Sequence, residues 1–230
     1  MNSDLESSTN GNSGCRVVVL ISGGGTNLQA LIDAAQQDTL AGAQLVGVLS
    51  NRPNAGGLAR AAQVSIPSIT LNHQDYASRE AFDAAMLHNI DAWQPDLVVL
   101  AGFMRILTPE FVAHYEGRMI NIHPSLLPKY PGLHTHARAI EAGDREHGAT
   151  VHFVTTELDG GPAIVQASVP VHSDDTEAIL AQRVQTVEHQ IYPAAVAWFA
   201  QGLLTMRSGR AYMRGKLIGS TGLNWNESAP

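Results

Sequence analysis

The chain has 230 residues, 44% hydrophobic and 15% charged, so it is long enough to bury a full core as one large domain. Its formal net charge is −7 with histidine neutral, and the few basic residues near the C-terminus form no surface typical of nucleic-acid binding. The single cysteine, Cys15, excludes an internal disulfide, and no apolar run approaches the roughly 20 residues of a membrane span. We therefore expect a cytoplasmic protein that binds neither nucleic acid nor membrane, with a disordered tail over residues 1–15.

The first half of the chain alternates predicted strands and helices. The run RVVVLI, residues 16–21, is typical of a strand buried on both faces, and a glycine turn and a helix with apolar spacing from Leu28 follow it. The next predicted elements are a strand at 43–50, a helix at 57–63, a strand at 66–71, a helix from the cap Ser78 to before Pro95, a strand at 96–102, a brief helix opened by Thr108 and Pro109, and a strand at 118–123. Such alternation predicts an α/β fold, with a Rossmann-like, mostly parallel sheet and helices on both faces.

The second half predicts strands joined by short turns and one long helix. A helix at 137–143 precedes strands at 149–154 and 163–171, which the turn sequence ELDGGP joins. In the long helix that follows, Pro193 is expected to cause a kink or an end, unless the helical pattern to Phe199 resumes at an angle. Residues 205–219 could form a small hairpin that turns at Arg214 and Gly215, and the last residues look loose.

The loop SGGGTN, residues 22–27, lies between a predicted strand and a predicted helix. Backbone N–H groups at such a helix N-terminus can hold a phosphate. The loop does not match the dinucleotide fingerprint, because Leu28 stands three residues after Gly25 and the second strand ends in Ser50-Asn51 rather than an acidic residue. A nicotinamide cofactor is therefore not expected, and the plain alternative is a tight turn that binds nothing.

Asn121 and His123 lie two residues apart on a predicted strand, so their side chains share one face where α/β sheets bind ligands. An amide beside an imidazole can stabilise an oxyanion, and the imidazole can also move a proton; the plain alternative is a structural histidine. A carboxylate would orient this histidine and favour its charged form. Asp159 is the best candidate, although it could be a simple turn residue, and Glu157 and Asp144 are competitors.

Three histidines, His134, His136 and His152, could suggest a metal site. No cysteine accompanies them and no His-x-x-x-His pair lies on a predicted helix, so no metal is expected. Taken alone, Arg79 and Glu188 would pass as surface charges of helices.

Five segments together resemble one family: VVLISGGGTNLQALID, VVLAGFMRIL, INIHPSLLPKYPGLHTH, HGATVHFVTTELDGGPAIVQ and RVQTVEHQIYP. In this order they are similar to glycinamide ribonucleotide transformylase, also called phosphoribosylglycinamide formyltransferase, of purine biosynthesis. The resemblance implies a formyltransferase domain over residues 16–206 and a C-terminal extension over 207–230. One departure is Gly24, a position where the family commonly carries another residue.

The resemblance implies formyl transfer from 10-formyltetrahydrofolate, the co-substrate, to the amine of glycinamide ribonucleotide. The catalytic residues would be Asn121, His123 and Asp159. The ribonucleotide would be bound by Gly25, Thr26, Asn27, Leu28, Gln29, Gln185, Thr186, Val187 and Glu188. The folate would be bound by Arg79, Met104, Arg105, Ile106, Leu107, Asn121, Thr155, Thr156, Glu157, Leu158 and Asp159.

The expected mechanism is direct attack of the amine on the formyl carbon, without a covalent enzyme adduct. His123 and Asn121 would stabilise the oxyanion, and Asp159 would favour the imidazolium. Three rivals stay open: formyltetrahydrofolate deformylase, which usually has an extra N-terminal domain; methionyl-tRNA formyltransferase, which needs a C-terminal RNA-binding domain; and a nucleotide-binding module without chemistry. The chain is expected to act as a monomer or a homodimer.

Overall fold

The central sheet has eight strands among residues 14–228, the part of the chain that the computed structural model describes. Their spatial order is β11-β7-β6-β5-β4-β1-β2-β3. In chain order they are β1 (Arg16–Ile21), β2 (Gln44–Ser50), β3 (Ser68–Thr70), β4 (Leu97–Leu100), β5 (Met119–His123), β6 (Glu146–Phe153), β7 (Ala163–Pro170) and β11 (Leu223–Asn224). All pairs from β3 to β5 are parallel and only β6 runs antiparallel to its neighbours, which confirms the predicted fold class.

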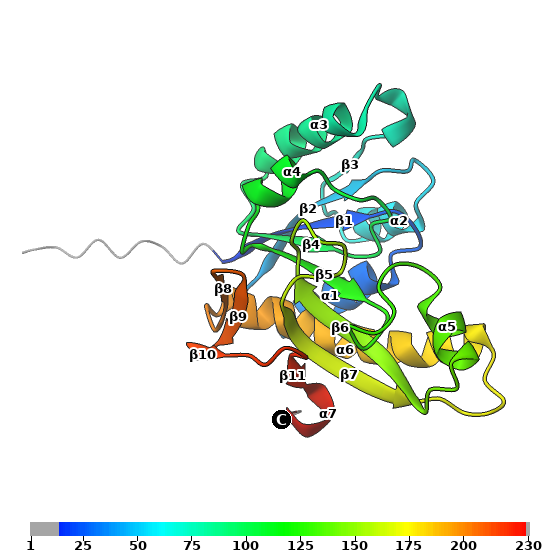
Figure 1. Cartoon of the computed structure of the whole chain (residues 1–230). Helices are drawn as coiled ribbons and strands as arrows, with labels where there is room; N and C mark the ends of the chain where they lie inside the picture. The colour runs from blue at the N-terminus through cyan, green and yellow to red at the C-terminus, as the bar shows by residue number, and fades with distance from the viewer. Residues whose placement is uncertain (1–13, 229–230) are drawn as a thin grey trace, which may run out of the picture.

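Helices cover both faces of this sheet (Figure 1). One face packs against α1 (Thr26–Gln36), α2 (Gly56–Gln63) and α6 (Glu177–Ala200), with α5 (Thr135–Glu141) beside α6. The other face packs against α3 (Arg79–Asp91) and α4 (Pro109–His114). A short 3-10 helix (His73–Asp75) precedes α3, and α7 (Trp225–Ser228) follows β11.

Strand β1 shows why the apolar run near the N-terminus is continuous. Val17 and Val19 pack into the hydrophobic cluster with α1 and α6, whereas Val18 and Leu20 pack into the cluster with α3 and α4. Because successive side chains of a strand point to opposite faces, a strand covered on both sides must be apolar at every position.

Two helix starts follow the predicted capping chemistry. The hydroxyl of Ser78 accepts from the N–H of Ala81 at 3.1 Å, and the hydroxyl of Thr108 accepts from the N–H of Phe111 at 3.3 Å. Each satisfies an N–H group that the first turn of a helix leaves without a partner. Both predicted caps are therefore confirmed.

Helix α6 continues through Pro193 to Ala200, so an end at this proline, one of the outcomes expected there, is wrong. The proline removes one backbone donor, but buried residues on both sides of it, Tyr192 and Val196 among them, keep the helix on the sheet. The hydroxyl of Tyr192 also donates to the carbonyl of Leu100 at 2.8 Å and so ties the helix to β4. Tertiary packing here outweighs the local cost of proline.

The C-terminal residues form more structure than the predicted hairpin. Strands β8 (Leu204–Arg207), β9 (Arg210–Met213) and β10 (Lys216–Leu217) make a small antiparallel sheet, in which Arg214 and Gly215 do form the β9–β10 turn. Strand β11 then pairs with β7, and Trp225 donates to Gln190 of α6 at 3.1 Å. The prediction of a loose end is wrong up to residue 228, because the edge of β7 offers these residues a partner.

The two ends of the chain are expected to form a disordered tail and a C-terminal extension. Residues 1–13 of the predicted tail lie outside the described residues. The division at residue 206 stays a prediction, although β8 crosses it and β11 returns to the main sheet. Between residues 14 and 228, no helix is long and apolar enough to span a membrane.

Candidate active site

Strand β5 carries two polar side chains within the apolar sheet. Ile120 and Ile122 pack into the cluster beneath α1 and α6, so Asn121 and His123 lie on the opposite face. His123 is the last residue of the strand and only 5% exposed, and a proline-rich loop follows it. The structure therefore places both side chains together, as their spacing predicted.

Asp159 joins this pair from the loop between β6 and β7. Its Oδ2 lies 3.4 Å from Nδ1 of His123 and accepts a 2.8 Å hydrogen bond from the N–H of Gly132. The backbone of Asp159 is left-handed, with φ at 52°, a conformation that Asp adopts more readily than most residues. Both side chains of the pair are buried, so water screens their interaction only weakly.

Asp144 and Glu157, the alternatives to Asp159 as the partner of His123, do not pair with this histidine in the structure. Asp144 accepts hydrogen bonds from the ammonium of Lys129 and the hydroxyl of Tyr130, and these bonds hold the pKa of its carboxyl below the usual value. Glu157 is exposed on the same loop as Asp159. Of the three candidates, Asp159 is the one that the structure pairs with His123.

His152 is a site residue that the sequence analysis considered only as a possible metal ligand. It stands opposite Asn121 in the β5–β6 register, and its Nε2 lies 3.2 Å from Nδ2 of Asn121. Its Nδ1 lies 2.9 Å from the carbonyl of Phe153, so Nδ1 carries the proton and Nε2 accepts from Asn121. Burial lowers the pKa of His152 to about 4, which keeps the ring neutral. One N–H of the Asn121 amide is thereby used, and the other stays available for a ligand.

The glycine loop leads directly into the N-terminus of α1. The first intrahelical bond runs from the N–H of Gln29 to the carbonyl of Gly25, so residues 26–28 have N–H groups without intrahelical acceptors. Gly25 has φ at 72°, and a Cβ there would lie 2.6 Å from Cα of Gly57, which makes glycine necessary. The loop is therefore a site suited to an anion.

Two side chains of α6 meet the start of α1. Gln185 donates to the hydroxyl of Thr26 at 2.9 Å, and Glu188 accepts from Nδ2 of Asn27 at 2.8 Å. Burial raises the pKa of Glu188, although the bond from Asn27 acts in the opposite direction. Oδ1 of Asn27 is buried and has no hydrogen-bond partner among the described residues, so it can accept from a bound hydroxyl or amine.

Two other predicted ribonucleotide residues on α6 do not join this group. Thr186 is exposed and donates to the carbonyl of Gln182 within its own helix. Val187 packs against the hydrophobic cluster. The structure thus brings Gln185 and Glu188 to the glycine loop, because residues three apart share one face of a helix.

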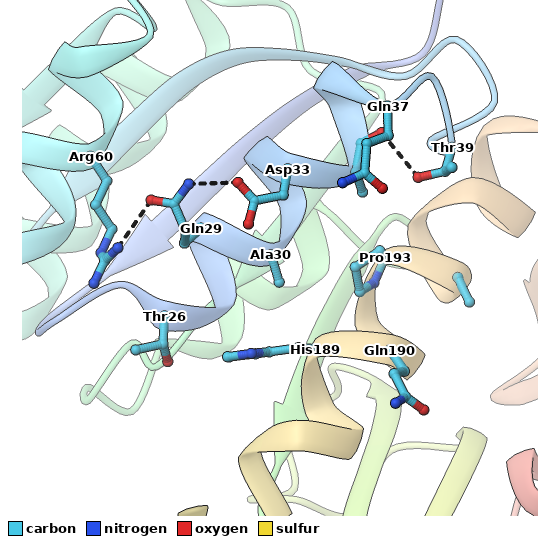
Figure 2. Close-up of a pocket in the computed structure, with 12 residues that line it drawn as sticks. Thr26, Gln29, Ala30, Asp33, Gln37, Thr39, Arg60, His189, Gln190 and Pro193 are labelled. Atoms are coloured by element: carbon cyan, nitrogen blue, oxygen red, sulfur yellow. Dashed lines mark hydrogen bonds between the residues drawn. The ribbon is translucent and has the colours of Figure 1, made fainter.

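A cavity of about 620 Å³ opens beside the glycine loop, between α1 and α6 (Figure 2). Thr26, Gln29 and His189 line it, and Arg60 of α2 reaches its edge. Arg60 donates to the carbonyl of Gly24 at 2.8 Å and to Oε1 of Gln29 at 3.0 Å. Arg60, which is not among the residues predicted from the sequence, both fixes the loop and brings a positive charge to it.

The segment after β4 presents apolar side chains to solvent. Met104 and Ile106 are 62% and 60% exposed, and Leu158 on the β6–β7 loop is 56% exposed. The N–H of Met104 donates to the hydroxyl of Ser22 at 2.8 Å, which ties this segment to the end of β1. Leu107 packs into the same hydrophobic cluster as Val154, the first residue of the β6–β7 loop. Exposed apolar side chains beside polar groups are typical of a surface that binds an apolar or aromatic ligand.

The remaining predicted folate residues lie around this segment. The guanidinium of Arg105 lies 5.2 Å from the ring of Phe82 in α3, and Arg79, the first residue of α3, is 3.9 Å from Glu80. Thr155 and Thr156 belong to the loop that carries Asp159. The ion pair of Arg79 with Glu80 does not link it to Asn121, His123 or Asp159, so its role in folate binding stays a prediction.

The histidines considered as metal ligands have other neighbours. His136 lies 3.2 Å from His147 through their ring nitrogens, His134 precedes α5 as its cap residue, and His152 contacts Asn121. Between residues 14 and 228, no three potential ligand side chains are grouped closely enough to hold a metal ion.

Known proteins share both the sequence and the fold. The family described as Formyl transferase matches residues 15–196. The chain is 56% identical to phosphoribosylglycinamide formyltransferase from Escherichia coli (strain K12), over 88% of this chain and 95% of the relative. The structure of phosphoribosylglycinamide formyltransferase from Coxiella burnetii superposes with a TM-score of 0.88 at 48% identity, covering 92% of this chain and 99% of that one. A formyltetrahydrofolate deformylase from Pseudomonas syringae matches at 26% identity and a TM-score of 0.81, covering 87% of this chain but 66% of that one. The chain therefore belongs to the formyl transferase family.

Proposed function

We propose that the protein transfers the formyl group of 10-formyltetrahydrofolate to the amine of N1-(5-phosphoribosyl)glycinamide, giving the N-formyl product and tetrahydrofolate in purine biosynthesis. The observation that carries this proposal is the grouping of Asn121, His123 and Asp159 on a sheet whose glycine loop is suited to a phosphate. The named function of relatives that match most of the chain supports it.

The catalytic group stabilises charge on the formyl oxygen. During transfer a bond forms between the amine nitrogen and the formyl carbon, the bond from that carbon to the folate nitrogen breaks, and a proton passes from the amine to the folate nitrogen. The folate supplies the formyl carbonyl. The free N–H of Asn121 and the Nδ1–H of the His123 imidazolium donate to the formyl oxygen as it gains negative charge, while Nε2–H stays bound to the carbonyl of Tyr130 and Asp159 orients the ring. His123 also takes part in passing the proton.

The binding residues hold the two substrates on either side of this group. The loop of residues 25–29 binds the phosphate, with the N–H groups of residues 26–28 as donors, and Arg60 adds charge attraction. Gln185 and Glu188 face the ribose and glycinamide parts of the ribonucleotide. The exposed side chains of Met104, Ile106 and Leu158 contact the folate ring.

Two alternatives differ in what they require. A deformylase needs the folate and the catalytic group but no ribonucleotide, so the contacts of Gln185 and Glu188 with the glycine loop favour the transferase. A binding module without chemistry needs the loop but not the pairing of a buried histidine with a carboxylate.

The direct test is to mix the purified protein with 10-formyltetrahydrofolate, with and without the ribonucleotide, and to measure folate absorbance together with the formylated product. We expect folate consumption that depends on the ribonucleotide. Consumption without it would support the deformylase, and no consumption would support the binding module.

Replacing His123 by Ala tests the catalytic assignment. We expect kcat to fall about 100-fold or more, because both the oxyanion donor and the proton relay are lost, whereas KM for the ribonucleotide changes little. The exposed His88 on α3 provides the control variant His88→Ala. A loss of ribonucleotide binding as large as the loss of kcat would contradict the assignment.

Three wider features complete the proposal. The protein works in the cytoplasm, for which its single cysteine is suited, and acts as a monomer or a homodimer. It uses small-molecule substrates without nucleic acid, in keeping with its net charge of −7.

A further inference from the structure

Both ring nitrogens of His123 have partners in the structure. Nε2 lies 2.8 Å from the carbonyl oxygen of Tyr130, and Nδ1 lies 3.4 Å from Oδ2 of Asp159. A carbonyl oxygen can only accept a hydrogen bond, so Nε2 carries a hydrogen whether the ring is neutral or charged. In the neutral ring the lone pair is therefore on Nδ1, the nitrogen that faces Asp159.

Tyr130 directs its carbonyl at His123 from a backbone conformation that is uncommon outside glycine. Its φ is 56°, in the left-handed region, where a bulky side chain is strained. The side chain is anchored at its far end, because its hydroxyl donates to Oδ2 of Asp144 at 2.8 Å. The guanidinium of Arg138 lies 5.0 Å from the tyrosine ring and donates to the carbonyl of Pro131 at 2.7 Å. These contacts offset the strain and fix where the Tyr130 carbonyl points.

The earlier part of the loop is held by contacts that do not involve the Tyr130 side chain. The hydroxyl of Ser125 donates to the carbonyl of Lys129 at 2.6 Å. Leu127 is bound on both sides, since its N–H donates to Thr150 and its carbonyl accepts from Gln166. Loss of the tyrosine hydroxyl should therefore free the peptide after Tyr130 without unfolding the loop.

We propose that Tyr130, anchored by Asp144, is a positioning residue that fixes the Nε2–H tautomer of His123 and makes Nδ1 the atom that gains and loses the proton during formyl transfer. Without the Tyr130 carbonyl, a neutral His123 would donate from Nδ1 to Asp159 and leave its lone pair on Nε2, on the wrong side of the ring. The catalytic part of this inference rests on the proposed function of His123, whereas the tautomer does not.

The first experiment compares the full chain with its Tyr130→Phe variant by ¹⁵N NMR of the histidine rings, with His123 assigned through His123→Gln. We expect the neutral wild-type ring to be in the Nε2–H form and the variant to contain a clear fraction of the Nδ1–H form. In the formyl-transfer assay we expect kcat to fall about fivefold, the effect of losing one hydrogen bond, with KM for both substrates within about twofold of wild type.

Lys129→Met provides a matched control, because Lys129 and Tyr130 bind the same carboxylate and only Tyr130 contacts His123. We expect this variant to keep both the tautomer and kcat. Asp144→Ala removes the anchor while leaving Tyr130 in place, and should reproduce the effect of Tyr130→Phe even where that variant folds poorly. The double variant should lose no more than the larger single loss, since both changes remove one interaction.

The possible results distinguish the role of Tyr130 in fixing the tautomer from the role of Nδ1 in the proton step. An unchanged tautomer in folded Tyr130→Phe and Asp144→Ala variants would overturn the positioning role. A changed tautomer with an unchanged kcat would overturn the assignment of Nδ1 to the proton step. A His123→Ala variant that retains full activity would instead overturn the proposed function, and the NMR result would still decide the tautomer.

Discussion

Asn121 can donate to a reacting oxygen only if its amide nitrogen, rather than its amide oxygen, is fixed by the protein. The neutral ring of His152 provides this selection, because its Nε2 lone pair accepts from Nδ2 of Asn121 at 3.2 Å. A flipped amide would place its oxygen against that lone pair. Since burial lowers the pKa of His152 to about 4, the selection holds throughout the neutral pH range.

Replacing His152 by Ala should lower kcat about five- to tenfold, because the Asn121 amide becomes free to rotate and one hydrogen bond of about 1 kcal/mol is lost. KM for the ribonucleotide should stay near the wild-type value. His152→Gln keeps an acceptor and should retain more activity than the alanine variant. Steady-state kinetics of both variants provide the measurement, and equal losses from Ala and Gln would show that the accepting atom is not what matters.

The residues of the proposed catalytic group that the sequence predicts lie close together in the chain or in a recognised motif. Asn121 and His123 share a face because of strand periodicity, and Asp159 follows from the need for a carboxylate and from the family resemblance. His152 and Tyr130 reach Asn121 and His123 through a strand register and a left-handed backbone, neither of which has a local signal. Arg60 reaches Gly24 across 36 positions of the chain, so only the folded structure shows that contact.

At the scale of elements, the glycine loop shows that neighbouring glycines can have different roles. Gly25 has a positive φ and packs against Gly57, because α1 and α2 approach each other there. A Cβ at Gly24 would have no other atom within 4 Å, and the φ of Gly24 is not positive. The departure from the family at Gly24 is therefore compatible with the same loop conformation.

Gly25→Ala should destabilise the protein by about 2–3 kcal/mol, because the left-handed conformation and the contact with Gly57 both oppose a side chain. Gly24→Ala serves as the matched control and should change the free energy of unfolding by less than about 0.5 kcal/mol. Urea denaturation gives both free energies, and KM for the ribonucleotide should rise only in the first variant. Equal effects of the two substitutions would contradict this account of the loop.

The elements that the sequence predicts best have strong local signals. Strand β1 is apolar at successive positions, and α3 and α4 begin with capping hydroxyls. Strand β11 has two residues and pairs with β7 almost 60 positions earlier, so it has no periodicity to detect. The expected end at Pro193 is wrong for a related reason, because the packing that stabilises α6 beyond this proline comes from the sheet rather than from the helix sequence.

At the scale of the whole molecule, the two-sided packing of the sheet buries ionisable groups. His147 and His152 are almost fully buried, and burial lowers the pKa of each to about 4; for His147 the neighbouring His136 adds to the effect. Burial raises the pKa of Asp83 and Glu188, which favours their protonated forms in the folded state. Acidification therefore destabilises the fold through the buried histidines and stabilises it through the buried carboxyl groups. The contribution of one histidine must be isolated by a variant that lacks it.

For His147 the direction follows from proton linkage. Between its ordinary pKa of 6.5 and the folded value of about 4, the unfolded chain binds a proton that the folded protein does not. Acidification across this range must therefore favour unfolding, and the stabilisation present above pH 6.5 is lost as the pH falls towards 4. His147→Gln has no such proton, so the difference in unfolding free energy, wild type minus variant, should decrease on acidification by on the order of 2–3 kcal/mol. Urea denaturation at about pH 7.5 and about pH 4.5 measures this difference, with the exposed His88→Gln as control. A difference that stays constant between the two pH values would mean that His147 can be protonated within the folded protein.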